Sequence, residues 1–521
     1  MRICRFHILL MMLGVFALVS CREEFPAGQQ HVPEVSVHFQ LQLSMPGAGG
    51  NSTKALEDEL NGKPEENKII SLTLFVIDLD DNNELIWNSI KFANYHMHIT
   101  ATTPTFETIK IDTKLGKKYI YVGANMTVAQ IQSFCDNRGV FTSQGTTYAQ
   151  TIADFVDLNG RGITMFGQMV DETNSRIIEI KDDVNELNPI KTKIELSRVV
   201  SKVALTYDSS TDGYATIASG IGGSINAGNI WFMLNNTAKS IDFIKGMDTG
   251  FSRFLMSDYL KHNIDNPPYY YTGNPSGDFM FYTPAAIVHS EHNTHNVGKI
   301  GMPFELTDNP YRRGLNKYLG LDNGKHRHYE SSLYCLESTV NTTGFAPAEN
   351  ILGVRRGINT EIVVAAKYTP GSIFHSDNIS TSPGNVPITV ADEDDMTSKT
   401  ANDPNGAGTF YAVRSGESNM YDFYTYNAKK YLEDNPPDPE GLPQFITYKG
   451  GYGYYTTFIS QPAGADIDDD ENYNLYRNHY YILSVKEFTP PGAVYPQDVY
   501  MLVNSATTEW RTGKSTTVIA E

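Results

Sequence analysis

Glu34-Val-Ser-Val-His-Phe-Gln-Leu-Gln-Leu-Ser44 is the most regular stretch of the chain. Its apolar side chains alternate with Ser, His and Gln, and they are Val35, Val37, Phe39, Leu41 and Leu43. A period of two places successive side chains on opposite faces of a strand. The stretch therefore predicts a β-strand with one apolar face and one wet face.

A Gly-rich loop follows this strand, from Met45 to Lys54, and a second strong strand is predicted at Ile69–Ile77. Exposed loops of small residues are sites where proteases cut. No arginine lies between the two strands, so a trypsin-like enzyme would have to use a lysine: Lys54, Lys63 or Lys68. The Lys54–Ala55 bond lies in the loosest setting and is the candidate processing site.

The first 21 residues have the form of a lipoprotein export signal. A basic start precedes the short apolar core Ile8–Ala17, and small residues lead to Cys21. This core is too short to span a bilayer as a helix. We expect residues 1–20 to be a signal peptide and Cys21 to be lipidated, which would tether the chain to a membrane; an ordinary buried N-terminal helix is the alternative.

The composition favours strands over helices. The chain has 31 Tyr, 25 Phe, 42 Gly and 25 Pro, a mixture that favours strands separated by turns. Further strands are predicted at 118–123, 175–180, 199–207, 229–234, 361–368, 480–485 and 499–503, and one short helix at 128–134. Many spaced strands are typical of antiparallel sandwiches, and 521 residues indicate at least two domains. The predicted fold class is all-β.

Charge and cysteine content exclude some classes of partner. The formal charge is -19, and loss of Arg2 and Arg5 with the signal peptide would make it -21. This acidity disfavours nucleic acid, because counterion release needs a basic face. Cys135 and Cys335 would remain as candidates for one bridge, although two buried thiols fit better.

Catalytic and metal-binding patterns are weak. Three histidines cluster in His289–His295, and acidic runs occur at Asp392–Asp395 and Asp466–Glu471. The histidines lack a His-Glu-x-x-His helix, and the acidic runs lack the glycine of an EF-hand loop. Solvated loops are the better interpretation. We expect no enzymatic activity, no metal site and no cofactor.

Several other motifs follow one another along the chain in a fixed order. They are Leu196–Leu205, Phe345–Asn350, Thr360–Pro370, Tyr476–Lys486 running into Pro490-Pro-Gly, and a terminal strand pair around Trp510. With the lipobox and the alternating strand before a basic loop, this set resembles the fimbrillins, the shaft and accessory subunits of type V pili on certain Gram-negative bacteria.

The resemblance implies two transthyretin-like Greek-key β-sandwich domains, at residues 55–198 and 199–521, behind a lipidated pro-segment at residues 21–54. It also implies a pilus assembled by donor-strand exchange. A trypsin-like surface protease would cut the outer-membrane precursor and release the strand at Val35–Leu43. A donor strand from another copy, or from an accessory fimbrial subunit, would fill the vacated groove and build a surface fimbrium. The donor would lie within Tyr495–Glu521 and include Val499, Met501, Val503, Val518 and Ile519.

Three alternatives remain open at this point. The first strand could stay in place permanently in a monomeric sandwich. The chain could be a tip or accessory fimbrial adhesin rather than a shaft subunit. It could also be a surface glycan-binding lipoprotein, in which tyrosines of Pro267–Tyr271 or Gly450–Tyr455 stack on sugars.

Overall fold

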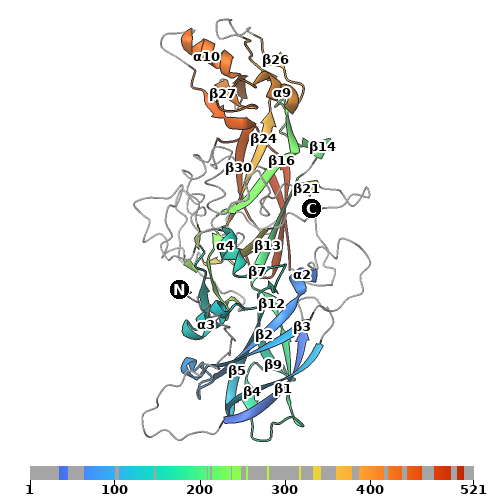
Figure 1. The fold of residues 1–521 in the computed structure, drawn as a ribbon, viewed down its shortest axis with the longest axis vertical. Coiled ribbons are helices and arrows are strands. Elements are labelled where there is room, and N and C mark those ends of the chain that lie inside the picture. The colour runs from blue at the N-terminus through green and yellow to red at the C-terminus, as the bar shows by residue number, and fades with distance from the viewer. Residues whose placement is uncertain are drawn as a thin grey trace, which may run out of the picture.

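The computed structural model places most of the chain in strands, with a few short helices. It describes residues 34–44, 64–99, 105–145, 148–207, 209–211, 214–235, 237–247, 254–255, 279–280, 316–317, 333–341, 360–377, 386–415, 420–436, 443–459, 474–494 and 502–509. The described part is elongated, with β1 and β4 near one end of the long axis and α9 and α10 at the other (Figure 1). The predicted all-β class is confirmed.

The N-terminal half is built on one large sheet with the strand order β3-β2-β5-β9-β11-β1-β4. Its strands are β1 (Glu34–Ser44), β2 (Ile69–Asp78), β3 (Lys91–Ile99), β4 (Thr105–Lys114), β5 (Gly116–Ala124), β9 (Met165–Asp171) and β11 (Ile190–Glu195). Two short strands join it, β10 (Ile178–Ile180) on β5 and β12 (Ser197–Arg198) on β9.

Strand β9 changes partners along its length, which divides the sheet into two parts. Residues 165–168 pair with β5, and residues 169–171 pair with β11. Side chains from β1, β4 and β11 on one part share a buried core with side chains from β2 and β5 on the other. The two parts therefore face each other across an apolar interior.

The other face of β2 is buried as well. Phe75 and Ile77 belong to a second core together with Phe134 of helix α3 (Val128–Asp136). This helix begins at Thr127, whose hydroxyl accepts a hydrogen bond from the backbone of Gln130 while the Gln130 side chain accepts one from the backbone of Thr127. Such a reciprocal cap satisfies two otherwise unpaired amides. The helix predicted at 128–134 is confirmed.

The C-terminal half contains two five-stranded sheets. The first has the path β21 (Asn316–Lys317), β13 (Val200–Tyr207), β31 (His479–Glu487), β32 (Leu502–Glu509), with β22 (Leu333–Leu336) also on β13. The second is β14 (Ser209–Thr211), β15 (Tyr214–Ala215), β16 (Ser224–Asn235), β24 (Glu361–Thr369), β30 (Tyr452–Phe458).

A small unit lies at the end of the long axis away from β1 (Figure 1). It contains the sheet β28 (Met420–Tyr424), β27 (Phe410–Ser415), β29 (Ile446–Tyr448), the pair β25 (Ser372–Ile373) and β26 (Ile388–Thr389), and helices α9 (Glu393–Lys399) and α10 (Tyr426–Asp434). We call it the distal unit.

Short elements complete the described structure. They are the pairs β6 (Val140–Thr142) with β18 (Ser240–Asp242), β7 (Val156–Asp157) with β8 (Gly162–Ile163), β17 (Thr237–Ala238) with β20 (Phe279–Met280), and β19 (Phe254–Leu255) with β23 (Val340–Asn341), and the helices α2 (Pro64–Asn67), α4 (Tyr148–Ala153), η1 (Trp87–Ser89), η2 (Lys245–Met247) and η4 (Lys449–Gly451).

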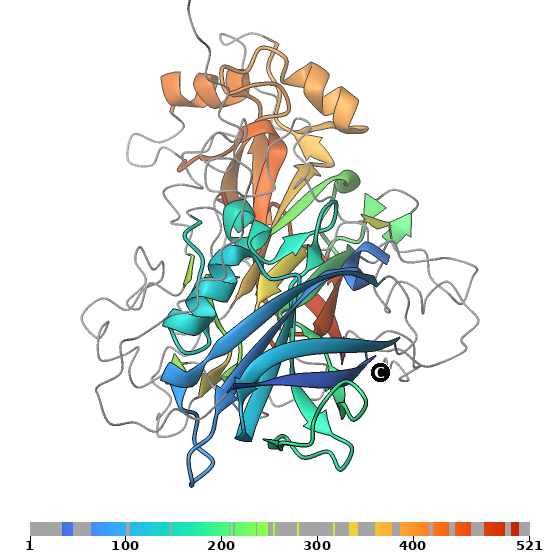
Figure 2. The same cartoon turned by 60° about the horizontal axis from the view of Figure 1, so that its bottom comes forward.

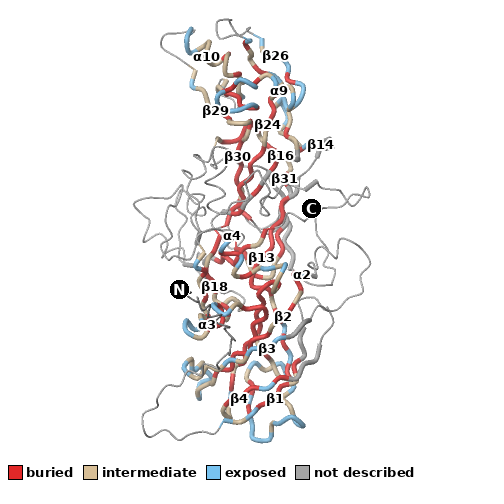
Figure 3. Tube along the Cα trace, in the orientation of Figure 1, coloured by how far each residue is buried: buried red, intermediate tan, exposed pale blue. Residues whose placement is uncertain are grey.

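The two halves meet in a shared buried core. The chain leaves the N-terminal sheet at Arg198, the end of β12, and enters the C-terminal sheet at Val200. The core that contains Phe75 and Phe134 also contains Val200 and Tyr480 from the C-terminal half. Buried residues consequently run along almost the whole molecule, from β1 and β4 to β24 (Figure 3).

Most predicted strands are confirmed, and their ends differ by a few residues. The stretch predicted at 199–207 forms β13, that at 361–368 forms β24, and that at 480–485 lies within β31. The stretch at 175–180 is strand only from Ile178. Part of the stretch at 499–503 lies outside the described residues, and β32 begins at Leu502.

Candidate functional site: the first strand and the junction of the halves

Strand β1 lies inside the sheet and has a partner on each side. It runs antiparallel to β4, where Val37 faces Ile111 and Phe39 faces Ile109. It runs parallel to β11, where Phe39 faces Ile190. Figure 2 shows β1 in dark blue within this layer of strands. We call the space between β4 and β11 that β1 fills the β1 groove.

The apolar face of β1 is part of the core. Val37, Phe39 and Leu41 are completely buried among side chains of the facing strands. Val35 is only partly buried, and the structure does not describe the side chain of Leu43. The predicted amphipathic strand is confirmed for its central three apolar residues.

Burial of these three side chains gives the strand a large share of local stability. At about 1.5–3 kcal/mol each, they contribute roughly 5–9 kcal/mol as an upper bound. A whole domain is typically stable by about 5–15 kcal/mol. Removal of β1 would thus expose an apolar groove and leave backbone groups of β4 and β11 without strand partners.

The side-chain polar contacts that the structure describes for β1 lie at the surface. The Ser36 hydroxyl donates to Asp112 at 2.5 Å, and Glu34 forms an ion pair with Lys91. Glu34 is about half exposed and Lys91 about one third exposed, so solvent weakens this pair. Apolar burial and backbone pairing hold β1 in its groove more than side-chain charge does.

The structure places only part of the predicted processing and assembly residues. Cys21, Lys54 and Ala55 lie outside the described residues, so lipidation and processing stay predictions. Among the proposed donor residues, Val499, Met501, Val518 and Ile519 also lie outside them. Val503 lies on β32, where its backbone pairs with Val485 of β31. This part of the tail completes the C-terminal sheet.

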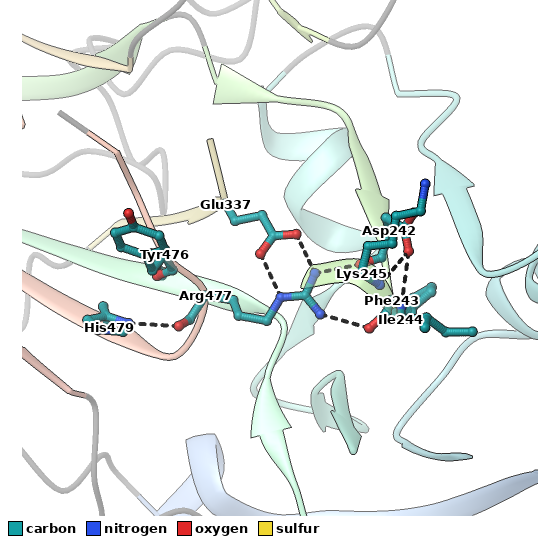
Figure 4. A network of polar contacts seen from close by, with 9 residues as sticks. Asp242, Phe243, Ile244, Lys245, Glu337, Tyr476, Arg477 and His479 are labelled. Atoms are coloured by element: carbon teal, nitrogen blue, oxygen red, sulfur yellow. Dashed lines mark hydrogen bonds and ion pairs between the residues drawn. The ribbon is translucent and has the colours of Figure 1, made fainter. Parts of the chain in front are cut away.

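Sequence reasoning missed two buried polar clusters at the junction of the halves. The first is centred on Arg477, at the turn before β31 (Figure 4). Its guanidinium donates to both carboxylate oxygens of Glu337, with Nε at 2.7 Å from Oε2. Further donations go to the carbonyl oxygens of Phe243, at 3.1 Å, and Asp242, at 2.7 Å. Arg477 thereby ties β31 to the segment between β18 and η2.

Close packing supports this cluster. A Cβ added to Gly246 would lie 1.6 Å from Nη2 of Arg477, so only glycine leaves room for the guanidinium. The Asp242 side chain accepts hydrogen bonds from the backbone of Ile244 and Lys245. Burial raises the pKa of Asp242, and these backbone donors and the nearby Lys245 and Arg477 oppose that rise.

The second cluster is centred on Glu66 of α2. Its Oε1 atom is 2.8 Å from Nζ of Lys202 and accepts a hydrogen bond from the hydroxyl of Tyr334. Both Glu66 and Lys202 are almost fully buried. Burial raises the pKa of Tyr334, and the Glu66 carboxylate raises it further. We call Glu66, Lys202 and Tyr334 the Glu66 cluster.

Arg198 lies beside this cluster and contacts Asn478, the residue that follows Arg477. It is completely buried and donates to the side chains of Asn67 and Asn478. Burial lowers the pKa of Arg198 to about 10, although Glu66 opposes the change, so the guanidinium stays charged near neutral pH. Its partner Asn478 adopts a left-handed backbone conformation, with φ 58°.

A sequence signal for these clusters existed. Arg198 and Lys202 are the only charged residues in Leu196–Leu205, whose other members are apolar or serine, and a charge inside a buried strand needs a partner. Both residues lie in the motif Leu196–Leu205, and Arg477 lies in the motif Tyr476–Lys486. Their partner Glu66 lies in an acidic stretch of ordinary surface composition, so no local pattern pointed to it.

The remaining candidate sites have structural roles or lie outside the described residues. Asp392 caps α9, and Asp395 forms an ion pair with Lys399. Of the tyrosines in Gly450–Tyr455, Tyr454 and Tyr455 are buried in the core and are not available to stack on a sugar, whereas Tyr452 is only partly buried. The structure does not describe the other candidates, at 267–271, 289–295 and 466–471.

Other structural tests concern the described residues alone. Cys135 and Cys335 do not form a disulfide with each other, and burial raises the pKa of Cys335 to about 12. Among the described residues, no group of three His, Cys, Asp or Glu side chains could hold a metal ion. In the same part of the chain, no helix is long and apolar enough to cross a bilayer.

Comparisons with solved structures extend over most of the chain. Two solved structures are similar to this chain over most of its length, both from Porphyromonas gingivalis. One is a fimbrilin, with 12% identity and a TM-score of 0.39, covering 92% of this chain and 99% of the other. The other is the tip fimbrial protein Mfa3 with C-terminal truncation, with 11% identity and a TM-score of 0.36, covering 91% and 100%. Both TM-scores are below 0.5, so these likenesses add nothing to the fold already described.

The family comparison is more specific. No curated protein sequence matches this chain. Residues 446–512 match the family model described as the C-terminal part of fimbrillin, the major fimbrial subunit protein type IV. This segment includes β31 and the motif around Arg477. The resemblance to the fimbrillins is thus confirmed for this C-terminal segment.

Proposed function

We propose that this protein is a structural pilin that polymerises after a protease removes its first strand. The observation that carries the proposal is the position of β1 between β4 and β11, with Val37, Phe39 and Leu41 completely buried. Its loss creates a groove with two unpaired strand edges and an apolar floor. A strand from a second copy can satisfy both requirements.

The geometry of the groove sets rules for the incoming strand. It must run antiparallel to β4 and parallel to β11, as β1 does. Alternate positions must be apolar to replace Val37, Phe39 and Leu41. Val499 and Met501, followed by Val503, have this spacing, whereas Val518 and Ile519 are adjacent and would point to opposite faces of a strand. Because Val503 already pairs within the C-terminal sheet, its use as a donor requires β32 to leave β31.

The proposed life cycle begins at the cell surface. Residues 1–20 direct export, Cys21 anchors the precursor to the outer membrane, and residues 21–54 carry β1. A trypsin-like surface protease cuts after Lys54, and the mature chain starts at Ala55. The resulting fimbrium contains further copies of the chain and accessory subunits, and the protein has a structural rather than an enzymatic role. A domain boundary at residues 198–199 fits the passage of the chain from β12 to β13.

Trypsin treatment of the purified full-length protein tests this proposal. We expect a product that begins at Ala55 and forms ladders that resist denaturant but dissociate on heating. The Lys54→Ala variant should yield neither the product nor the ladders, and Lys63→Ala serves as its matched control. Ladders of normal length and amount from Lys54→Ala would exclude Lys54 as the processing point. A cut product that remains monomeric would contradict strand exchange.

A further inference from the structure

Glu66 lies where the chain returns from the predicted processing loop to the body of the protein. Helix α2 is the first described element after β1, and residues 45–63 separate the two. The partners of Glu66 come from the other half of the chain: Lys202 lies on β13 and Tyr334 on β22. The start of the second predicted strand is consequently tied to the C-terminal half.

The residues next to Glu66 are held as firmly. Asn67 accepts a hydrogen bond from the buried Arg198. The side chain of Asn125 bonds the backbone on both sides of the Lys68–Ile69 bond, since it donates to the Lys68 carbonyl at 2.6 Å and accepts from the Ile70 amide at 2.9 Å. Ile69 is completely buried. A protease needs an extended, accessible segment, which this stretch cannot offer while these contacts hold.

The Lys68 side chain is occupied as well. Its Nζ atom donates to the carbonyl oxygen of Gly160 at 2.6 Å. A trypsin-like enzyme recognises the lysine ammonium group itself, so this contact competes with recognition. Detaching Lys68 requires α2 to leave the junction and β2 to fray at its first residues.

The three lysines between β1 and β2 therefore differ sharply. The Lys63–Pro64 bond has proline on its C-terminal side. The proline ring and the missing amide hydrogen make this bond a poor substrate for a trypsin-like enzyme. The Lys68–Ile69 bond is held in the fold by the contacts above. Lys54 lies outside the described residues; in the sequence it ends a Gly-rich stretch and is followed by alanine rather than proline.

We propose that the Glu66 cluster sets the downstream limit of processing, so that the mature chain always retains α2. This inference rests on the proposed function, because it concerns the same cleavage. A cut at Lys68 would remove Glu66 and take its carboxylate away from two buried cations, Lys202 and Arg198. A buried charge that loses its partner is strongly destabilising. Retention of α2 keeps the junction intact while the β1 groove opens.

Time-resolved trypsin digestion with mass analysis of the new N-termini tests the inference. The variants are Glu66→Gln and Lys202→Met in the full-length chain, with Tyr334→Phe as a milder change that removes one hydrogen bond and no charge. Phe410→Leu, in the core of the distal unit, is the matched control for general destabilisation. We expect cleavage of the Lys68–Ile69 bond to be at least tenfold faster in Glu66→Gln and Lys202→Met, with a smaller increase in Tyr334→Phe. Phe410→Leu should leave the rate at this bond unchanged.

Each outcome separates this inference from the proposed function. Cleavage at Lys68 at the wild-type rate in all three cluster variants would overturn the inference, as would equal acceleration by Phe410→Leu. If Glu66→Gln or Lys202→Met fails to fold, the rate for Tyr334→Phe against the control decides. Absence of any cut after Lys54 in the wild type would count against the proposed function. Acceleration at Lys68 in the cluster variants would still support the limit set by Glu66.

Discussion

Replacing Phe39 by alanine tests whether β1 belongs to the core before processing and is absent afterwards. Phe39 is completely buried and faces Ile109 on β4 and Ile190 on β11. Truncating a buried phenylalanine to alanine typically costs about 3–5 kcal/mol. At about 1.4 kcal/mol per factor of ten, local opening of the sheet should become about 100- to 5,000-fold more frequent.

Hydrogen exchange with mass spectrometry measures this opening directly. Peptides that cover β4 and β11 should lose protection by that factor in the Phe39→Ala precursor, whereas peptides from β24 should change little. Ser36→Ala is the matched control on the exposed face of the same strand, and it should cost no more than about 0.5 kcal/mol.

The decisive comparison uses protein cut after Lys54 and allowed to polymerise. Wild-type and Phe39→Ala subunits then have identical sequences from Ala55 onward, so their exchange profiles should coincide. A loss below about 1 kcal/mol in the precursor would refute the view that β1 contributes strongly to the core. A difference that persists in the polymer would refute the removal of β1.

Two further predictions concern the junction. Gly246→Ala should lower the free energy of unfolding by about 3 kcal/mol or more, because the added Cβ displaces Arg477 from Glu337. The control is Gly222→Ala, where a Cβ meets nothing within 4 Å and the free energy of unfolding should change by less than about 1 kcal/mol. Equal midpoints of the two variants in urea denaturation would contradict this packing. Burial raises the pKa of Cys335 from 9.0 to about 12, so the folded state holds this proton more tightly. Its contribution to stability is complete below pH 9 and is lost as the pH rises toward 12, by about 2 kcal/mol at pH 10.5. In urea unfolding, Cys335→Ala should therefore show a smaller fall in stability between pH 8 and pH 10.5 than wild type, and parallel falls would contradict the burial effect.

The sequence predicted β1 well because the signal is local. Alternation from Val35 to Leu43 needs no knowledge of the rest of the chain, and one face of the resulting strand is indeed buried. Its neighbours could not be predicted in the same way. β4 and β11 are far away in the sequence, and the parallel pairing with β11 depends on the path of the whole sheet.

The junction escaped prediction for a related physical reason. The charges of Arg198 and Lys202 in a predicted buried strand indicate that each needs a partner. Only the fold shows that Glu66 pairs with Lys202 and that Asn67 accepts a hydrogen bond from Arg198. The acidic stretch before β2 has the composition of a solvated surface, but tertiary contacts bury Glu66 within it. The tail could not be placed from sequence for the same reason. The alternation of Val499, Met501 and Val503 predicts a strand but does not determine whether that strand pairs within its own subunit or with another copy.

In the proposed assembly, β1 leaves the subunit and another strand takes its place. Mass analysis and N-terminal sequencing of subunits isolated from surface fibres test it most directly. We expect subunits that begin at Ala55 and lack residues 34–44. Fibres whose subunits still carry Val37, Phe39 and Leu41 within an uncut chain would contradict it.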